Sequence, residues 1–484
     1  MTDFNPAIFT TTMAVLGVVI VVASLLSGLL ERRAVPPVAV FLLLGLAVGP
    51  LGLGLLDVGL QSTALGAIAT LSLTLVLFTD ALTIDRAGIR ANLRLAVLIL
   101  GPGTLLVTGL IGLAAWWLLE LHPALAAILG AALASTDPVM MRALLRQSAV
   151  PRSARVALGV ESGLNDVVVL PVVLVAMAFL EPAGATAAGV GRVGLNVLLL
   201  GPIAGALIGF VAVRLLEAMR ARFGLRRDYE SLYVIGVALA AYAAAESVHA
   251  SGFMAAFAAG LTIAFLDVEL CDCFHDYGEA TSEMFLLFAF VALGTSLIWE
   301  GLGAISWQSL SFAGIALFAR SLVLWTALRW TSVDPESKSL IIWFGPRALS
   351  SVLLVLLPVF AGVPNAAALF PVCALIVLLS VVIHGGMLMK WGGRLSEAGG
   401  LRGRSPRASD RDVVGSSELI TIDEYRELVR IKEPVRLLDV RSPSSYEGAD
   451  LQASGSIRTD PRRPVESAAA AALPKSDWLI AYCA

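Results

Sequence analysis

The chain has 484 residues, of which 58% are hydrophobic and only 15% are charged, and its formal net charge is −3. Soluble domains carry about 25% charged and about 45–50% apolar residues, so this composition excludes an ordinary soluble protein over most of the length. A mean hydropathy of +0.85 indicates a polytopic membrane protein instead. The 4 cysteines are too few for a disulfide framework. We expect a lipid bilayer around the chain, no nucleic-acid partner and no cofactor.

About 13 apolar segments are long enough to cross a bilayer core, which takes about 20 helical residues. They lie at 10–30, 35–56, 62–84, 93–119, 123–145, 152–180, 190–219, 228–248, 250–267, 276–298, 304–330, 337–361 and 366–391. The sequence therefore predicts an all-α polytopic membrane domain over residues 1–391. The first segment follows an almost uncharged leader, and we interpret it as a retained helix rather than a cleaved signal peptide.

The basic residues are distributed unevenly among the predicted loops. Basic clusters at 31–33, 85–94, 142–155 and 214–227 follow the first, third, fifth and seventh segments, whereas the even-numbered loops are neutral or acidic. Short loops rich in Lys and Arg stay in the cytoplasm. The pattern predicts a bacterial inner (plasma) membrane protein with its N-terminus outside, and an odd number of helices leaves the tail in the cytoplasm. The acidic loop at 267–279 goes against the trend, although acidic residues weigh little in this rule.

The sixth segment carries polar residues within an otherwise apolar run at 156–175. Glu161, Ser162, Asn165 and Asp166 are spaced i, i+1, i+4 and i+5, so they share one broad face of a helix. An ionised carboxylate in the middle of a membrane helix is unfavourable by about 2.5–3.5 kcal/mol on insertion scales. Two acids in one span make insertion of the helix less favourable, so they indicate a function. The pattern predicts a cation site inside the membrane.

Two segments contain a proline in mid-span beside polar residues. The fifth has Asp137 and Pro138 in its middle, and the twelfth has Pro346 and Arg347 at the corresponding place. Proline removes a backbone donor and clashes with the preceding turn, so both helices should unwind there. Interrupted helices at matching positions indicate two inverted six-helix repeats, with crossed, unwound helices 5 and 12 around a central site. Two unrelated proline kinks are the alternative, which the charges beside the prolines disfavour.

The polar residues predicted at membrane depth form one set: Thr136, Asp137, Glu161, Ser162, Asn165, Asp166, Arg320 and Arg347. An unpaired arginine inside a membrane is costly, so Arg347 needs an acidic partner, which we predict to be Glu161. We favour a structural role for that pair. For Asp137 and Asp166 we favour function, with structural ion pairing as the alternative. We interpret His384, in the last segment, as a packing residue rather than a pH sensor.

The predicted site has the ligand chemistry of a small monovalent cation, which prefers hard oxygens. The Asp137 and Asp166 carboxylates, the Ser162 hydroxyl and carbonyls freed near Thr136 would supply them. Burial disfavours a charged carboxylate, so Asp166 could hold either a proton or the cation. Competition of the two ions for one acid, combined with alternating access, gives antiport. Asn165 is neutral, so only one member of the Asn-Asp pair changes its charge.

Three motifs resemble the cation:proton antiporter family of sodium/proton exchangers, in its branch with an Asn-Asp pair: TDPV at 136–139, ESGLND at 161–166 and G-x-R at 345–347. LFTDALTID at 77–85 and SVHASGFMAAFAAGL at 247–261 are similar to further segments of that family. The resemblance implies an electroneutral antiporter that exchanges Na+, or alternatively K+ or Li+, for H+. It also implies a homodimer in which a core domain moves like an elevator against a dimer domain.

The resemblance further implies a role for each site residue. These roles are ion exchange for Asp166, ligation for Thr136, Asp137 and Ser162, support of Asp137 for Asn165, and pairing with Arg347 for Glu161, with Arg320 as a further supporting residue. Two positions depart from the family pattern, Ala348 after the arginine and Ala81 in the LF-x-x-GL motif. Both replace a glycine by another small residue, which affects local packing rather than the class of protein.

The composition changes abruptly after residue 391. Residues 392–417 are rich in Gly, Arg and Ser and are predicted to form a flexible linker. In 418–484 a helix with Thr421 as N-cap, an Ala-rich helix at 464–473, and apolar strands at 435–441 and 478–484 alternate, which is typical of a small α/β domain.

This tail resembles a partial rhodanese-like domain, on the motif LLDVR-S-x-x-x-Y, a later GSI, and an apolar strand that ends in cysteine. The resemblance would make Cys483 the sulfur-carrying nucleophile. The loop expected after Cys483 is absent, and the expected histidine is replaced by Gln452 and Ala453. We therefore expect no sulfurtransferase activity, and either a regulatory or dimerising role or a disordered stub. The alternative for the whole chain is a membrane-anchored rhodanese-like sensor or sulfurtransferase whose helices sense ions or hold the tail.

Overall fold

A computed structural model gives the structure of the chain. It describes residues 14, 17–22, 25–26, 35–84, 97–145, 150–180, 186–223, 227–266, 268–329, 331 and 333–402, and in the tail 425–426, 429–430, 434–441, 446, 452–459, 467, 471, 473 and 478–482. The chain divides into two compact units, Met1–Gly403 and Arg404–Ala484. Each unit is described by itself.

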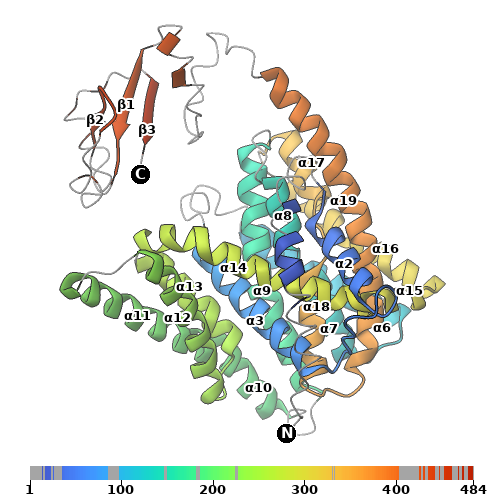
Figure 1. The fold of residues 1–484 in the computed structure, drawn as a ribbon. Helices are drawn as coiled ribbons and strands as arrows, with labels where there is room; N and C mark the ends of the chain where they lie inside the picture. The colour runs from blue at the N-terminus through green and yellow to red at the C-terminus, as the bar shows by residue number, and fades with distance from the viewer. Residues whose placement is uncertain are drawn as a thin grey trace. The chain divides into compact units, whose positions relative to one another are not determined.

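The first unit is built from helices (Figure 1). Its first half contains α2 (Pro37–Val48), α3 (Thr63–Leu82), α6 (Thr104–Leu118), α7 (Pro123–Ala134), α8 (Pro138–Leu145) and α9 (Arg152–Ala178). Its second half contains α10 (Ala187–Leu195), α11 (Gly201–Phe223), α12 (Arg227–Ser247), α13 (Gly252–Leu266), α14 (Val268–Thr295), α15 (Glu300–Gly303), α16 (Trp307–Leu328), α17 (Pro335–Trp343), α18 (Leu349–Phe360) and α19 (Leu369–Arg402).

Seven of the described helices are long and apolar enough to cross a membrane, or eight if a bent pair, Thr281–Thr295 and Leu297–Gly303, is one span. Four shorter apolar helices lie at 37–48, 232–247, 252–266 and 349–360. The chain is thus a multi-pass membrane protein, while the number of about 13 spans stays a prediction. Every predicted segment from residue 35 onward coincides with a described helix or broken pair of helices. The segment at 10–30 lies largely outside the described residues.

Prolines at other positions do not break their helices. Pro171 lies inside α9, which is continuous for 27 residues. Pro102 lies in a π-helical turn, Ile99–Gly103, that leads directly into α6. A second π turn, Asn196–Leu200, joins α10 to α11 just before Pro202. The wider turn accommodates a residue that lacks a backbone donor without unwinding the helix.

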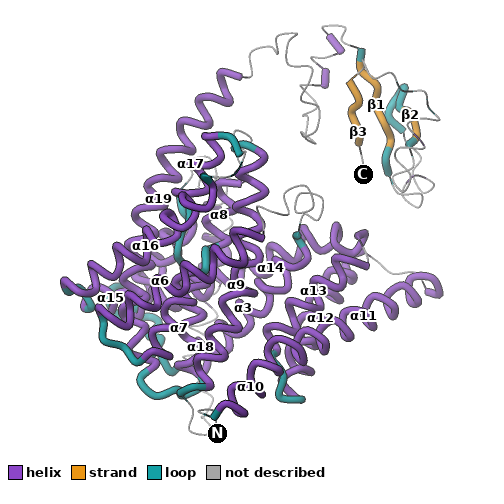
Figure 2. The backbone as a smooth tube through the Cα atoms, turned by 180° about the vertical axis from the view of Figure 1, so that it is seen from behind, coloured by secondary structure: helices purple, strands orange, loops and turns teal. Residues whose placement is uncertain are grey.

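Helices α11, α12 and α13 lie side by side, apart from the group that contains α6, α7 and α16 (Figures 1 and 2). They share a separate apolar core with α3, to which Phe78, Val213 and Val234 contribute. Gly201, Gly205 and Gly209 line the side of α11 that faces α13, and a Cβ on Gly205 would collide with the carbonyl of Ala255. Small residues at such spacing let two membrane helices approach closely.

The tail unit contains a three-stranded parallel sheet with the order β2-β1-β3. Its strands are β1 (Val435–Asp439), β2 (Ile457–Arg458) and β3 (Trp478–Tyr482). The strands predicted within 435–441 and 478–484 are present, and the structure shows that they pair with each other. Thr421 and Cys483 lie outside the described residues. The helix α19 continues to Arg402, past the residue where we predicted the linker to begin, and the domain boundaries stay predictions.

Candidate functional site

Both predicted interruptions are present in the structure. α7 ends at Ala134 and α8 begins at Pro138, while α17 ends at Trp343 and α18 begins at Leu349. Proline suits the first position of a helix, because the backbone donor that it lacks would have no partner there. The carboxylate of Asp137 accepts a hydrogen bond from the backbone N–H of Met140 at 2.9 Å. Asp137 therefore caps the N-terminus of α8, where a negative charge is favourable.

The two interrupted segments touch one another. The backbone N–H of Asp137 donates to the carbonyl of Pro346 at 2.9 Å. The Arg347 Nη1 atom donates to the carbonyls of Ala134 and Ser135 at 2.9 and 2.8 Å. Those carbonyls belong to the last residue of α7 and to its C-cap, where the helix dipole leaves a partial negative charge. Arg347, which is 1% exposed, thus acts as a cationic cap on the first broken helix from within the second.

Glu161 is paired with Arg320 and not with Arg347, which corrects our prediction. Arg320 of α16 donates from Nε and Nη2 to the two carboxylate oxygens of Glu161, and both side chains are buried. Arg320 also reaches the carbonyl of Ile342 near the end of α17 at 3.3 Å. The bidentate fork of an arginine matches a carboxylate, whereas Arg347 is held by carbonyls. These partners are 159 positions apart, so no sequence pattern links them.

Asp166 lies at the centre of the polar region and is 1% exposed. The hydroxyl of Ser135 donates to its Oδ1 atom. Ser350, in the first turn of α18, lies beside the same carboxyl group. The Oδ2 atom has no hydrogen-bond partner within the described part of the chain. One carboxylate oxygen is therefore fixed by a hydroxyl, while the other remains open to a proton or a cation.

Asn165 and Ser162 occupy less central positions than we expected. The Asn165 Nδ2 atom donates to the Thr136 hydroxyl at 2.7 Å, so its observed bond supports the residue before Asp137. Its Oδ1 atom is buried and lacks a hydrogen-bond partner among the residues described. The Ser162 hydroxyl donates to the carbonyl of Gly159 in its own helix at 3.3 Å. Its role as a ligand stays a prediction.

The site offers oxygen atoms of several kinds within one buried region. They comprise the Asp137 and Asp166 carboxylates, the Asn165 amide oxygen, the serine and threonine hydroxyls, and carbonyls at the break after α7, two of which are already bonded by Arg347. Unwound carbonyls and half-helix ends are typical ligands of Na+ in transporters. In the described ranges, no group of three or more His, Cys, Asp and Glu side chains is arranged to hold a metal ion. The chemistry fits a monovalent cation and a proton.

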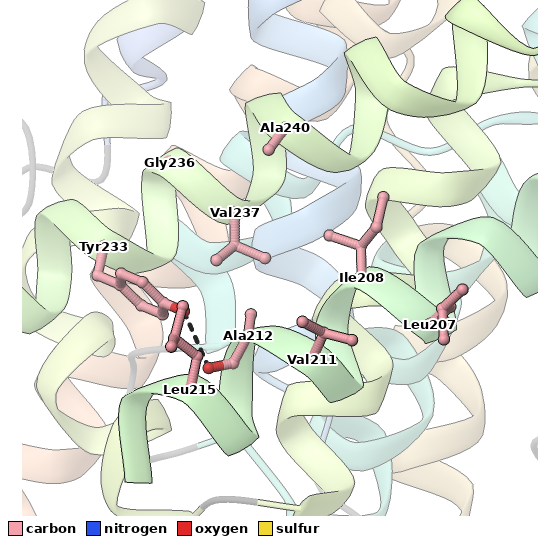
Figure 3. A pocket seen from close by; sticks show the side chains of 9 residues that line it. All are labelled: Leu207, Ile208, Val211, Ala212, Leu215, Tyr233, Gly236, Val237 and Ala240. Carbon is pink, nitrogen blue, oxygen red and sulfur yellow. Dashed lines mark hydrogen bonds between the residues drawn. The ribbon is translucent and has the colours of Figure 1, made fainter. Parts of the chain in front are cut away.

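The apolar grooves on the surface of the bundle do not contain this site. One of about 550 Å³ lies between α11 and α12 (Figure 3), and its lining includes Leu207, Val211 and Tyr233. The Tyr233 hydroxyl donates to the carbonyl of Ala212 at 2.9 Å. Another groove of about 750 Å³ lies between α6 and α16 and is lined by residues such as Trp117 and Phe318. Neither groove is lined by a charged side chain, so neither provides ligands for an ion.

The sequence interpretation missed three residues of the site, Ser135, Ser350 and Ser380, and treated His384 as a packing residue. Ser135 directly precedes the TDPV motif and Ser350 follows Arg347 by three residues, so their proximity to the breaks was a usable signal. Ser380 and His384 lie on α19. The Ser380 hydroxyl accepts the backbone N–H of Arg347 at 2.7 Å. A serine and a histidine four residues apart are common in helices, so this pair gave no sign that Ser380 contacts Arg347.

Known proteins resemble the chain over its membrane part. The family model for the transmembrane sodium/hydrogen exchanger matches residues 17–391. The K(+)/H(+) antiporter NhaP of Alkalimonas amylolytica is 27% identical over 382 residues, which cover 77% of this chain and 65% of that protein. The Na(+)/H(+) antiporter NhaG of Bacillus atrophaeus is 25% identical over 333 residues, which cover 66% of this chain and 62% of that protein. The chain thus spans slightly less than two thirds of the length of these relatives.

A solved structure shares the fold. The sodium proton antiporter MjNhaP1 from Methanocaldococcus jannaschii at pH 8 superposes with a TM-score of 0.64 at 18% sequence identity, covering 81% of this chain and 99% of that one. The residues that the family model matches, 17–391, include both breaks, between α7 and α8 and between α17 and α18. By its sequence motifs, its helical fold and this match over most of its length, the chain belongs to the sodium/hydrogen exchanger family.

Proposed function

We propose that the chain is a secondary antiporter that exchanges a monovalent cation for a proton across a membrane. The observation that carries this proposal is the open Oδ2 atom of buried Asp166, next to two broken helices that contact each other at Asp137 and Pro346. Membership of the exchanger family and the antiport named for its relatives support it. The exchange is a transport reaction, so it needs neither an enzymatic step nor a cofactor.

Asp166 is the group for which the two ions compete. A bound cation balances the carboxylate charge in a buried environment, and a proton removes that charge. The empty, charged carboxylate is the unfavourable state, so the site changes its exposure from one side to the other only with a cation or a proton bound. Thr136, Asp137 and Ser162 are proposed as further ligands. Alternating exposure of this one site to the two sides then couples the opposite movements of the ions.

The charges around Asp166 favour an electroneutral exchange. Asn165 is neutral, and Glu161 is compensated by Arg320. Asp137 caps the N-terminus of α8 through the backbone N–H of Met140, so Asp166 is the carboxylate proposed to exchange one cation for one proton. Na+ is the proposed ion, with K+ and Li+ as alternatives, because the relatives are named for K(+)/H(+) and Na(+)/H(+) antiport and hard oxygens bind all three.

The test of this proposal is ion exchange by the purified chain in proteoliposomes. A Na+, K+ or Li+ gradient should drive a change of internal pH, and Asp166→Asn should abolish it because the amide cannot carry the exchanged proton. Glu217→Gln is the matched control, since Glu217 is an acid on α11 whose side chain is 46% exposed. Robust exchange by Asp166→Asn would overturn the assigned mechanism. Currents far faster than carrier turnover would indicate a channel instead.

We further propose the setting in which this transport takes place. The bacterial inner membrane, an outside N-terminus and a cytoplasmic tail rest on the distribution of basic loops. Two inverted six-helix repeats rest on the matched breaks, and a homodimer rests on the family resemblance. For the tail, the parallel strands support a partial rhodanese-like domain, for which we propose a regulatory or dimerising role. A sensor or sulfurtransferase is the less favoured reading, because the family match covers the membrane part.

A further inference from the structure

A chain of hydrogen bonds leads from a histidine on α19 to the Asp166 carboxylate. His384 Nδ1 lies 3.0 Å from the Ser380 hydroxyl, and that hydroxyl accepts the backbone N–H of Arg347 at 2.7 Å. Arg347 in turn donates to the carbonyl of Ser135 at 2.8 Å. The hydroxyl of Ser135 donates to Asp166. All five residues are buried, with exposures of 5% or less.

The contact between Ser380 and Arg347 supplies an acceptor for a backbone N–H that the broken helix leaves without one. Arg347 lies between the end of α17 and the start of α18, so its backbone N–H has no helical carbonyl as acceptor. A buried donor without an acceptor is strongly unfavourable, especially where no water or lipid group can replace it. The Ser380 side chain supplies that acceptor from another helix. It thereby fixes the backbone from which the Arg347 guanidinium extends.

His384 holds the same interrupted segment at a second point. Its Nδ1 atom contacts the Ser380 hydroxyl and lies 3.2 Å from the Ser380 carbonyl, which restrains the serine rotamer. Its ring packs edge-on against Phe344, with 6.3 Å between the ring centroids. Phe344 is the first residue after α17 and is fully buried. α19 therefore contacts the segment between α17 and α18 at both Phe344 and Arg347.

We propose that Ser380 and His384 are positioning residues of the exchange site, which act through Arg347 and Ser135 on the geometry of Asp166. The inference rests on the proposed antiport function. Neither residue touches the ion. By holding the interrupted segment, they keep the Arg347 side chain on the last carbonyls of α7 and keep Ser135 oriented towards the carboxylate. Removing the contacts of Ser380 or His384 lowers the affinity of the site for the cation more than it slows the maximal turnover.

The experiment measures Na+/H+ exchange in proteoliposomes as a function of Na+ concentration. Ser380→Ala should raise the half-saturating Na+ concentration about tenfold, as expected when a buried donor loses its acceptor. Ser380→Thr keeps the hydroxyl and should restore the wild-type value. His384→Ala should give a smaller rise, which His384→Asn reduces because its side chain can still bond to Ser380. Thermal stabilisation of the detergent-solubilised protein by Na+ should weaken in the same order.

The matched control is Ser72→Ala. Ser72 is a fully buried serine on α3 whose hydroxyl donates to the carbonyl of Phe285 at 3.1 Å, away from this chain of contacts. It should leave the half-saturating concentration unchanged. An active wild type in which Ser380→Ala also leaves that concentration unchanged would overturn the positioning role alone. A wild type that exchanges neither Na+, K+ nor Li+ would instead overturn the proposed function.

Discussion

At the residue scale, two buried arginines face two different kinds of negative charge. Arg320 pairs with a carboxylate, whereas Arg347 faces the carbonyl end of a half-helix. The Nε and Nη2 atoms of Arg347 have no hydrogen-bond partner among the described residues. Arg347 therefore places a positive charge against the dipoles of two peptide carbonyls, close to the place where a cation is proposed to bind. Glu161 and Asp166 also differ in their partners among the described residues, because Glu161 is ion-paired with Arg320 whereas Asp166 accepts a hydrogen bond from the Ser135 hydroxyl.

Removing one member of the Glu161–Arg320 pair should be strongly destabilising. Glu161→Ala leaves a buried guanidinium without a counter-charge, which typically costs about 3–5 kcal/mol. Glu161→Gln combined with Arg320→Gln removes both charges and should recover most of the loss. The measurement is the thermal unfolding midpoint of the purified protein in detergent.

The control for that experiment is an exposed ion pair on the same protein. Arg214 and Glu217 of α11 are 3.3 Å apart, with side chains 64% and 46% exposed. Exposed pairs contribute about 0–1 kcal/mol, so Glu217→Ala should leave the midpoint almost unchanged. Equal shifts for Glu217→Ala and Glu161→Ala would contradict the assignment of a buried, charge-balanced pair.

The tail contains a carboxylate whose contribution to stability depends on pH in a defined sense. Hydrogen bonds from Arg441, at 2.6 and 2.9 Å, and from Tyr482, at 2.8 Å, hold the pKa of the Asp439 carboxyl well below its usual range. Because the folded pKa is lowered, the charged group stabilises the sheet at every pH above the usual Asp value of about 4. That stabilisation declines progressively as the pH falls below the usual value, and it is lost once the pH has fallen through the lower folded value.

Asp439→Asn should therefore weaken the tail sheet by the same amount throughout the neutral range. The measurement is amide hydrogen exchange of β1 and β3 in the full chain, compared between the variant and the wild type at pH 5 to 8. Protection should be lower in the variant at each pH. A difference that grows or vanishes within that range would show that another group controls the stability of the sheet.

At the scale of elements, the surroundings of a proline decide whether a helix breaks. Pro138 follows Ser135, Thr136 and Asp137, and the freed carbonyls there are satisfied by Arg347. Pro171 is flanked by Leu170 and Val172, which offer no polar group, and its helix stays continuous. In a membrane, unwinding without such partners would leave backbone groups unsatisfied, which is strongly unfavourable. The breaks therefore occur where polar side chains from other helices are available.

The close approach of α11 and α13 gives a prediction at the same scale. Gly205→Leu should push the two helices apart, because even a Cβ there would overlap the carbonyl of Ala255. The thermal unfolding midpoint should fall. Gly236→Ala on α12 is the matched control, since a Cβ at Gly236 meets no atom within 4 Å. An unchanged midpoint for Gly205→Leu would contradict the packing of these helices.

At the scale of the whole molecule, the site lies entirely within the first compact unit. Every residue of the Asp166 region falls between 134 and 384, and the family match ends at 391. Deleting 404–484 should therefore leave cation/proton exchange with an unchanged half-saturating cation concentration. The measurement is exchange in proteoliposomes, with Asp166→Asn in the shortened chain as the inactive control. Loss of all exchange in the shortened protein would favour the sensor interpretation, in which the tail carries the activity.

The sequence alone determined the class of protein, the apolar segments from residue 35 onward that coincide with described helices, and the two breaks. These features depend on local chemistry, since hydropathy requires helices in a bilayer and a proline beside polar residues marks an interruption. The polar set around Asp166 was predictable for the same reason, because acids within apolar segments are rare and functional. Ser135 could have been added from its position before Asp137.

The tertiary structure alone decided which of these groups are partners. Glu161 was expected to bind Arg347, and the fold brings Arg320 to it instead, because α16 presents a guanidinium fork to both carboxylate oxygens. The same holds for Ser380, whose contact with Arg347 joins α19 to a segment 33 positions earlier. Pairing across distant helices depends on three-dimensional packing, for which a single sequence carries no periodic signal. A sequence therefore identifies a buried charge, and the fold determines what neutralises it.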